Sequence, residues 1–377
     1  REGQVRFRLF QIIRWYARER LGSSREATER RHAVWFVAQG EHHVGADHGG
    51  EARESFTWLR LEIDHLLDVA DCYALADPTL AARATLCALP FLRTSRGVRD
   101  ELAALGPVWV NADAVEPVVC ARLLIAHGRA RNGQGDGLAA RRDWDRALDI
   151  ATQLGRTDLQ GRALMWLAFS HVPGELAEAE QLSNRALQWL DQASDVYGIA
   201  RCRENLGIIY RLAGRTEESR AEHEHAIALC QRIGARVLEG LCLGNLVTAL
   251  RALMLVEVTR DVLERAISIA REVGDLRHLG VLLTKMGDQT LARGDIQGAI
   301  ALCEEALELR HSAEDPITTC RTRVLFARAL MCGERVDEAE GQLHACSDAG
   351  SPTPNTEIAA AIQYNFAKAA LLRGDPI

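Results

Sequence analysis

Bulky apolar residues recur along the chain at steps of 40 residues, and small residues recur in phase with them. The bulky positions are Trp166, Leu206, Leu246, Met286, Phe326 and Phe366. Alanines follow the same rhythm at Ala147, Ala186, Ala226, Ala266 and Ala306, with steps of 39, 40, 40 and 40. A fixed period of this length is typical of solenoids, in which each repeat packs only on its neighbours. The pattern therefore predicts one elongated array of similar units.

The residues between these two series predict a pair of helices in each repeat. Mostly small side chains, which let a neighbouring helix approach closely, follow the bulky position at Gly128, Leu167, Gly207, Val247, Gly287, Ala327 and Ala367. Seven residues later a glycine, suited to the left-handed turn that ends a helix, recurs at Gly135, Gly174, Gly214, Gly294 and Gly374, with Gly333 one place early and Met254 as the exception. Small residues then open a second helix at Ala140, Ala179, Ser219, Thr259, Ala299 and Ala339.

This pattern resembles the tetratricopeptide repeat, which has a bulky residue, a small residue, a glycine between its helices and two small residues on the second helix. The resemblance covers residues 117–377, about seven repeats, the last ending after its first helix. It implies an all-α fold, an α-α superhelical solenoid. The family repeat is usually nearer 34 residues, so each unit here carries about six more. Longer repeats of this kind are common in bacterial signalling proteins of the STAND ATPase group.

The N-terminal segment has a different pattern. Val5, Phe7 and Leu9 alternate with arginines as in a β-strand, and helical spacing follows from Ile12. The stretch Arg6–Leu21 is similar to the segment that ends the nucleotide-switch region of LuxR-type and related predicted-ATPase regulators. We therefore expect a short strand and helix remnant before the solenoid. Since the chain begins without methionine, we also expect it to be a piece of a longer protein.

Two further stretches, Arg30–Phe36 and Trp58–Leu66, look like the next two helices of those regulators. The resemblance implies that residues 1–45 end a winged-helix or linker region and that residues 46–116 form a helical linker or atypical capping repeats. Residues 117–377 are then the repeat array. Within the middle region we expect irregular helical pairs, with Pro90 interrupting a helix.

Composition narrows the class of protein little further. Hydrophobic residues make up 47% of the 377 residues and charged residues 26%, which is ordinary for a soluble protein. No apolar run is long enough to span a membrane. The ten cysteines form no CxxC pair and fall mostly in helical segments, where they resemble small hydrophobic residues. A reducing cytoplasm fits this usage.

Motifs for catalysis are missing from the sequence. It contains no GxxxxGK[ST] phosphate loop, and its two lysines, Lys285 and Lys368, do not follow glycine-rich turns. Kinase HRD and DFG elements, a GxSxG elbow and an HExxH helix are also lacking. We therefore expect no enzymatic activity and no cofactor, and any ATPase should lie upstream.

The stretch Glu41–His48 gathers three histidines and two carboxylates, which are residue types that bind zinc. It is polar and continues into Gly49 and Gly50, so ordering it around a metal would cost conformational entropy. We expect a solvated loop and no metal site.

The inner wall of the solenoid carries the candidate binding residues. In a tetratricopeptide array the concave face is lined by first-helix positions five and two residues before the bulky residue, and two and five after it. On these positions fall Arg122, Arg129, His171, Arg201, Glu204, Arg211, Arg251, Asp288, Arg321, Arg328, Tyr364 and Lys368. Eight are basic and two acidic, although the whole chain has a net charge of −7. A basic groove selects anionic partners. Alternatively, these arginines pair with carboxylates on adjacent helices, an arrangement that is commonplace.

Two functions remain open. The first is a regulatory or sensor module of a signal-transduction ATPase or transcriptional regulator, which binds a small anionic effector, a peptide or a protein in its groove. The second is a passive adaptor that recruits an acidic peptide or protein. Direct binding of nucleic acid is not expected, because the chain is acidic and lacks aromatic platforms. Self-association is an option for the full-length protein.

Overall fold

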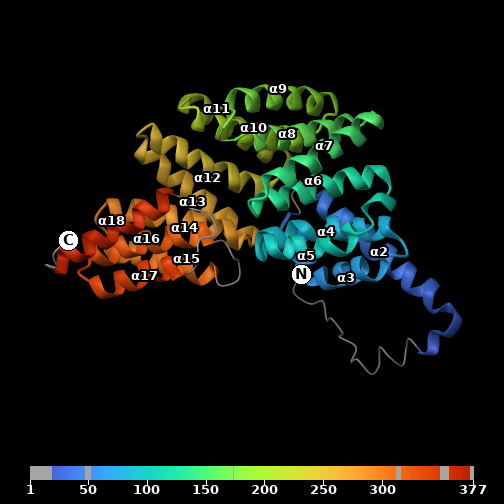
Figure 1. The fold of residues 1–377 in the computed structure, drawn as a ribbon, viewed down its shortest axis with the longest axis horizontal. Coiled ribbons are helices and arrows are strands. Elements are labelled where there is room, and N and C mark those ends of the chain that lie inside the picture. Colours follow the sequence, from blue (N-terminus) through green and yellow to red (C-terminus); the bar gives the residue numbers. More distant parts are fainter. Residues whose placement is uncertain (1–18, 47–51, 173, 311–315, 349–355, 374–377) are drawn as a thin grey trace.

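The computed structural model describes residues 19–46, 52–172, 174–310, 316–348 and 356–373, and these ranges contain helices and no strand (Figure 1). The all-α fold expected from the sequence is confirmed. The strand expected at residues 5–9 lies outside the described residues. No described helix combines the length and apolar character that crossing a membrane requires.

In the described residues, four α-helices and two short 3₁₀ helices precede the repeats. They are η1 (Gly22–Ser24), α2 (Arg25–Ala46), α3 (Ala52–Tyr73), α4 (Pro78–Ser95), α5 (Val98–Trp109) and η2 (Ala112–Ala114). Leu59 and Leu66 of α3 and Leu92 of α4 are buried in a core that these helices share with α6. The division of the chain at residues 45 and 116 stays a prediction.

Helix pairs of similar length follow, each pairing an inner helix with an outer one. The inner helices are α6 (Pro117–Gly133), α8 (Thr157–Ser170), α10 (Val196–Leu212), α12 (Arg236–Ala252), α14 (Leu276–Ala292), α16 (Pro316–Cys332) and α18 (Thr356–Arg373). The outer helices are α7 (Gly137–Gln153), α9 (Leu176–Gln192), α11 (Thr216–Ile233), α13 (Val256–Val273), α15 (Ile296–Arg310) and α17 (Val336–Asp348). The array is thus the predicted solenoid of tetratricopeptide-like pairs, and α18 is the first helix of a last unit.

The small residues of the repeat lie where helices touch. Ala186, Ala226 and Ala266 have no exposed surface. A Cβ atom added to Gly128 would come within 2.5 Å of the Trp144 ring, and one added to Gly207 would come equally close to the His223 ring. The sequence period therefore reflects close helix contact, as expected from the side-chain sizes.

The turn between the two helices of a pair contains a residue in the left-handed conformation, and this residue is not always a glycine. Gly135, Gly214 and Gly294 have positive φ angles of 95°, 75° and 87°. Met254, the exception in the glycine series, has a φ of 60°, and Glu334, one residue after Gly333, has a φ of 61°. In these five pairs a left-handed residue thus occupies this place, although the left-handed conformation costs a non-glycine residue about 1–2 kcal/mol.

The array curls until its N-terminal helices meet its later repeats. Helix α4 contacts α14, and α3 contacts α13, across about 200 residues of chain (Figure 1). Side-chain hydrogen bonds join successive inner helices: Asn245 Nδ2 donates to Glu204 Oε1 at 2.7 Å, and the Thr284 and Thr322 hydroxyls lie 2.8 Å apart. The inner helices therefore form a continuous wall around a central space.

Two expectations for the N-terminal region are wrong. Residues 41–46 continue α2 instead of forming a loop, because Glu41 accepts two hydrogen bonds from Arg83 of α4 (2.7 and 2.8 Å) and the His43 ring stacks on Trp58 at 4.6 Å. Asp47 and His48 lie outside the described residues. Helix α4 also continues through Pro90, whose carbonyl oxygen accepts a hydrogen bond from the Thr94 hydroxyl at 3.2 Å.

Candidate functional site: a cationic cavity inside the superhelix

A cavity of about 580 Å³ lies inside the curl, between the N-terminal helices and the inner helices of the repeats. Its wall includes residues of α3, α4, α6, α8, α10, α12, α14 and α16. Both ends of the curl therefore contribute to one space. A volume of this size suits a small ligand or a few residues of a peptide.

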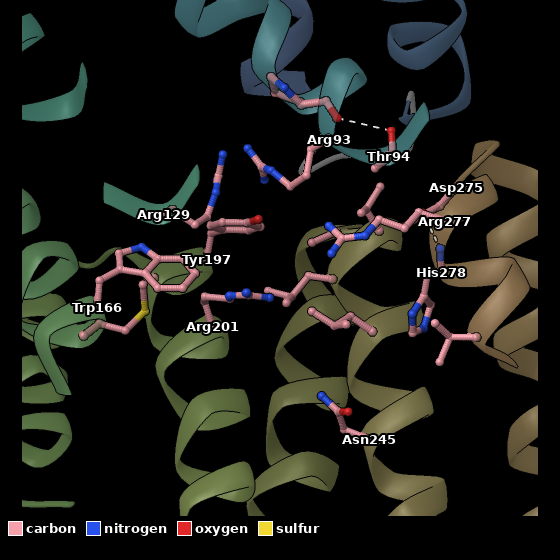
Figure 2. Close-up of a pocket in the computed structure, with 18 of the residues that line it drawn as sticks. Arg93, Thr94, Arg129, Trp166, Tyr197, Arg201, Asn245, Asp275, Arg277 and His278 are labelled. Atoms are coloured by element: carbon pink, nitrogen blue, oxygen red, sulfur yellow. Dashed lines mark hydrogen bonds between the residues drawn. The ribbon is translucent and has the colours of Figure 1, made fainter. Parts of the chain in front are cut away.

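Six cationic side chains line the space, which we call the cationic cavity: Arg93, Arg129, Arg162, Arg201, Arg277 and Lys285. They come from α4, α6, α8, α10 and α14. Figure 2 shows Arg93 and Arg129 on one side, Arg277 entering from α14 and Arg201 lying across the space between them. The curl thus collects charges from distant parts of the sequence.

One carboxylate serves two of these arginines. Glu101 of α5 accepts hydrogen bonds from Arg93 Nε at 2.9 Å and from Arg129 Nη2 at 3.0 Å, and its side chain is only 3% exposed. Burial favours the neutral acid, but Arg129 and Arg93 outweigh it and hold the pKa of Glu101 below its ordinary value. Burial, and then repulsion by Arg93, lowers the pKa of Arg129 to about 9. The Nε of Arg129 has no hydrogen-bond partner among the described atoms.

Two further arginines have their own partners. Arg162 donates to both carboxylate oxygens of Asp195, at 2.6 and 3.1 Å, and Asp195 also caps α10 through the backbone N–H of Gly198. The Arg201 guanidinium lies 5.2 Å from the centre of the Trp166 ring and 3.4 Å from Glu204. These contacts hold both side chains against the wall and place a carboxyl group beside each guanidinium.

Two carboxyl groups at the wall are shifted toward the neutral form. Burial raises the pKa of Glu204, although Arg201 and a hydrogen bond from Asn245 oppose it. Burial also raises the pKa of Asp275, which caps α14 by accepting from the His278 N–H at 2.9 Å. Six cations thus face four neighbouring carboxyl groups, Glu101, Asp195, Glu204 and Asp275, in the described part of the wall. The cavity carries a net positive charge.

A second group of charged residues lies toward the C-terminal ends of the inner helices. We call this surface the basic edge, and it consists of Arg211, Arg251, Asp288 and Arg328. Asp288 accepts from Arg251 at 2.6 Å and from Arg328 at 3.4 Å. Arg211 forms no ion pair with any residue that the structure describes. This edge therefore has three cations and one carboxylate.

The residues predicted from the repeat register are thus divided among several places. Arg129 and Arg201 line the cavity, Glu204 is buried behind its wall, and Arg211, Arg251, Asp288 and Arg328 form the basic edge. The remaining positions lie elsewhere: exposed Arg122 on α6, His171 at the end of α8, Arg321 beside a small cavity of about 110 Å³ that α16 forms with α18, and Tyr364 and Lys368 on α18. His171 Nδ1 lies 2.6 Å from Glu175 Oε2.

Four cavity cations were absent from the sequence prediction: Arg93, Arg162, Arg277 and Lys285. Arg277 occupies the position nine residues before the bulky marker, where Tyr197 also lines the cavity. The first turns of the inner helices therefore face the cavity, whereas the predicted positions include later turns. Lys285 had a usable signal, because it is one of only two lysines beside 43 arginines. Arg93 comes from α4, outside the repeat register.

One cluster resembles a metal site by residue type. His171, Glu175 and Glu178 bring possible ligand atoms within 4.8 Å of one another, and it is the one such group found in the described ranges. Both glutamates are exposed, and Glu175 already bonds the imidazole. Nothing further marks this cluster as a binding site.

The fold and its cavity define the class of protein: an α-solenoid of tetratricopeptide-type helix pairs whose interior is cationic. A tetratricopeptide-repeat family model matches residues 199–233, which cover most of α10, the turn after it and α11. A search of curated proteins found no match.

Solved structures share the fold at low sequence identity. The chain is similar to Rap protein complexed with Competence and Sporulation Factor, with a TM-score of 0.57 and 11% identity over 91% of this chain and 98% of the other. It is similar to NprR in complex with its peptide NprX, with a TM-score of 0.54 and 12% identity over 90% and 98%. It also resembles PH0952 of Pyrococcus horikoshii, a STAND protein with a tetratricopeptide repeat sensor, with a TM-score of 0.53 and 11% identity. That match covers 84% of this chain and 55% of PH0952.

Proposed function

We propose that this chain is the regulatory and sensor part of a signal-transduction protein, of the STAND ATPase or transcriptional-regulator type, and that it binds an anionic effector or peptide in the cationic cavity. The observation that carries the proposal is the convergence of six cations from five helices on one cavity. An anionic ligand would lower the repulsion among these cations and would form charge-assisted hydrogen bonds with them.

The site has unused capacity for such a ligand. The buried Arg129 Nε has no partner, and Glu101 is shared by two guanidinium groups. A buried N–H donor without an acceptor costs free energy that a bound acceptor would recover. The lowered pKa of Arg129 has the same origin, since burial and Arg93 both oppose its charge.

The similar structures support a role in regulation by ligands. These structures are Rap with a bound factor, NprR with a peptide, and PH0952 with its tetratricopeptide repeat sensor. We extend this role to the present chain because its cavity joins the N-terminal helices to α14, so that one ligand would touch both ends of the curl. Binding there would bias the position of α2–α5 relative to the repeats. We place the protein in the cytoplasm, without a catalytic role of its own.

The test is calorimetry with pentaglutamate as an acidic probe and pentalysine as its opposite. Pentaglutamate should bind, and Arg201→Gln and Arg277→Gln should each weaken its affinity about tenfold, since a hydrogen bond to a charged group is worth about 1.5–3 kcal/mol. Arg232→Gln is the matched control, because Arg232 is exposed on the outer helix α11. Equal affinities in all four proteins, or preference for pentalysine, would reject the cavity as an anion site.

The alternative is a passive adaptor that holds an acidic peptide or protein. The basic edge favours it, because it extends the positive charge beyond the cavity, where a longer peptide could lie. Hydrogen exchange separates the two functions. In the sensor, saturating pentaglutamate should slow exchange in α2–α5 as well as in the inner helices. In the adaptor, protection should be confined to α10–α16.

A further inference from the structure

Lys285 differs from Arg93, Arg129, Arg162 and Arg201, which each lie beside a carboxylate, because it has no carboxylate partner among the described residues. Its Nζ donates to the Gly244 carbonyl at 2.5 Å and to the Thr248 hydroxyl at 3.0 Å, both on α12. It forms no ion pair within the described ranges. A partly buried ammonium group held only by neutral acceptors is an expensive arrangement.

Other cations surround Lys285. Burial, together with repulsion by Arg211, Arg251 and Arg321, lowers its pKa to about 8. Asp288, the acidic residue of the basic edge, lies about one turn further along α14. It already accepts hydrogen bonds from Arg251 and Arg328. Three inner helices, α10, α12 and α14, therefore bring Arg211, Arg251 and Lys285 to one place, where Asp288 is the carboxylate of the basic edge.

We propose that this place, where the cavity meets the basic edge, is a subsite for a phosphate monoester group, with Lys285 at its centre and Arg211 and Arg251 beside it. The inference rests on the proposed function and names the chemical class of the anion. An ammonium has three N–H donors, and Lys285 uses two of them within the protein. The third can reach a ligand from the cavity wall.

A phosphate monoester matches this environment better than a carboxylate does. It carries a charge of about −1.5 to −2 at neutral pH and offers three acceptor oxygens. A carboxylate carries one charge, which would leave most of the local cations unneutralised. Lysine binds phosphate as a compact charge, and arginine adds planar pairs of donors. A small phosphorylated molecule and a phosphorylated peptide share this chemistry.

The experiment measures binding of two phosphate probes by calorimetry, each against its counterpart without phosphate. AMP is compared with adenosine, and a capped tripeptide with phosphoserine at its centre is compared with the same tripeptide with serine. At least one phosphorylated probe should bind at least tenfold more tightly than its counterpart. The tighter of the two identifies the source of the phosphate group. If phosphate adds no affinity in either pair, the subsite does not exist.

Variants assign the effect to Lys285. Lys285→Gln should weaken the phosphorylated probe at least tenfold, Lys285→Arg should retain most of the affinity, and Arg232→Gln should have no effect. Glutamine keeps an N–H donor for Gly244 and Thr248, so the fold should survive, and a circular dichroism melt checks this. Unchanged affinity in a folded Lys285→Gln protein overturns the proposal.

Proton uptake gives a second readout. A bound phosphate dianion should raise the pKa of Lys285 from about 8, so that binding at pH 8.5 takes up protons. The other charged groups that act on this position are Arg211, Arg251 and Arg321. Burial lowers the pKa of the neighbouring His223 and His278, and Lys285 contributes to both shifts. Titrations in buffers of different ionisation enthalpy measure the uptake, which should disappear in Lys285→Gln. Uptake that persists in this variant contradicts the assignment.

The proposed anion-binding function and the proposed phosphate subsite can be rejected independently of each other. If pentaglutamate binds and Arg201→Gln weakens it, while phosphate adds no affinity, the sensor cavity stands and the phosphate subsite falls. If neither pentaglutamate nor a phosphorylated probe binds, both fall.

Discussion

The two sides of the central space stabilise positive charge in different ways. On the side of α4–α8, Arg93, Arg129 and Arg162 each lie against a carboxylate, either Glu101 or Asp195. On the side where α12 and α14 meet, Lys285 has only neutral acceptors and lies among further cations. A cationic side chain that lines a groove can thus be held in an ion pair of the fold or remain available to a ligand. The partners of the side chain, and not its residue type, distinguish these two cases.

The paired side should be the side on which stability depends. Replacing Glu101 by Ala would leave Arg93 and Arg129 without their common counter-ion. Breaking a buried pair in this way costs about 3–5 kcal/mol, and the 3% exposure of Glu101 gives little relief from solvent. We expect a loss of about 3 kcal/mol in the free energy of unfolding, measured by urea denaturation. A loss below 1 kcal/mol would show that the two arginines do not need this carboxylate.

The pH dependence of this pair has a definite sign. The folded-state pKa of Glu101 lies below its ordinary value of 4.5. The carboxylate therefore contributes stability above pH 4.5, and this contribution is lost as the pH falls through the folded-state pKa. The difference in unfolding free energy between wild type and Glu101→Ala should shrink on acidification, and a constant difference from pH 7 to pH 3 would contradict the pairing.

The unpaired side should respond to alkaline pH instead. The pKa of Lys285 is about 8 in the fold and 10.5 as its ordinary value. Between these values the unfolded chain binds more protons, so the free energy of unfolding rises with pH. Since Lys285 is partly exposed to the cavity, we expect a gain of only about 1 kcal/mol from pH 8 to pH 10. The gain is measured against Lys285→Gln, which should lack it. Parallel curves for the two proteins would place Lys285 with the paired side.

The sequence predicted the features of the fold that recur in every repeat. The period of 40 residues predicted the helix pairs and the buried alanines, because both depend on contacts between neighbouring helices. The cavity depends on the curl, which brings α4 to α14, and no local period records that contact. Arg93 and Glu101 were therefore out of reach. Arg277 and Lys285 lay within the repeats but at positions that face inward only in a tightly curled array.

The weakest predicted effect on stability concerns Arg211, on the basic edge. It has no ion pair among the described residues, so Arg211→Gln should change the free energy of unfolding by less than about 0.5 kcal/mol. The same substitution should weaken a phosphorylated probe at low salt, and this loss should shrink as salt rises, because screening already weakens contacts of partly exposed charges. Paired measurements at 20 mM and 300 mM salt check both statements. The matching variant on the paired side, Arg162→Gln, should lower stability, because it leaves the half-buried Asp195 without its guanidinium partner. If Arg211→Gln is the more destabilising of the two, the contrast between the paired and unpaired sides is wrong.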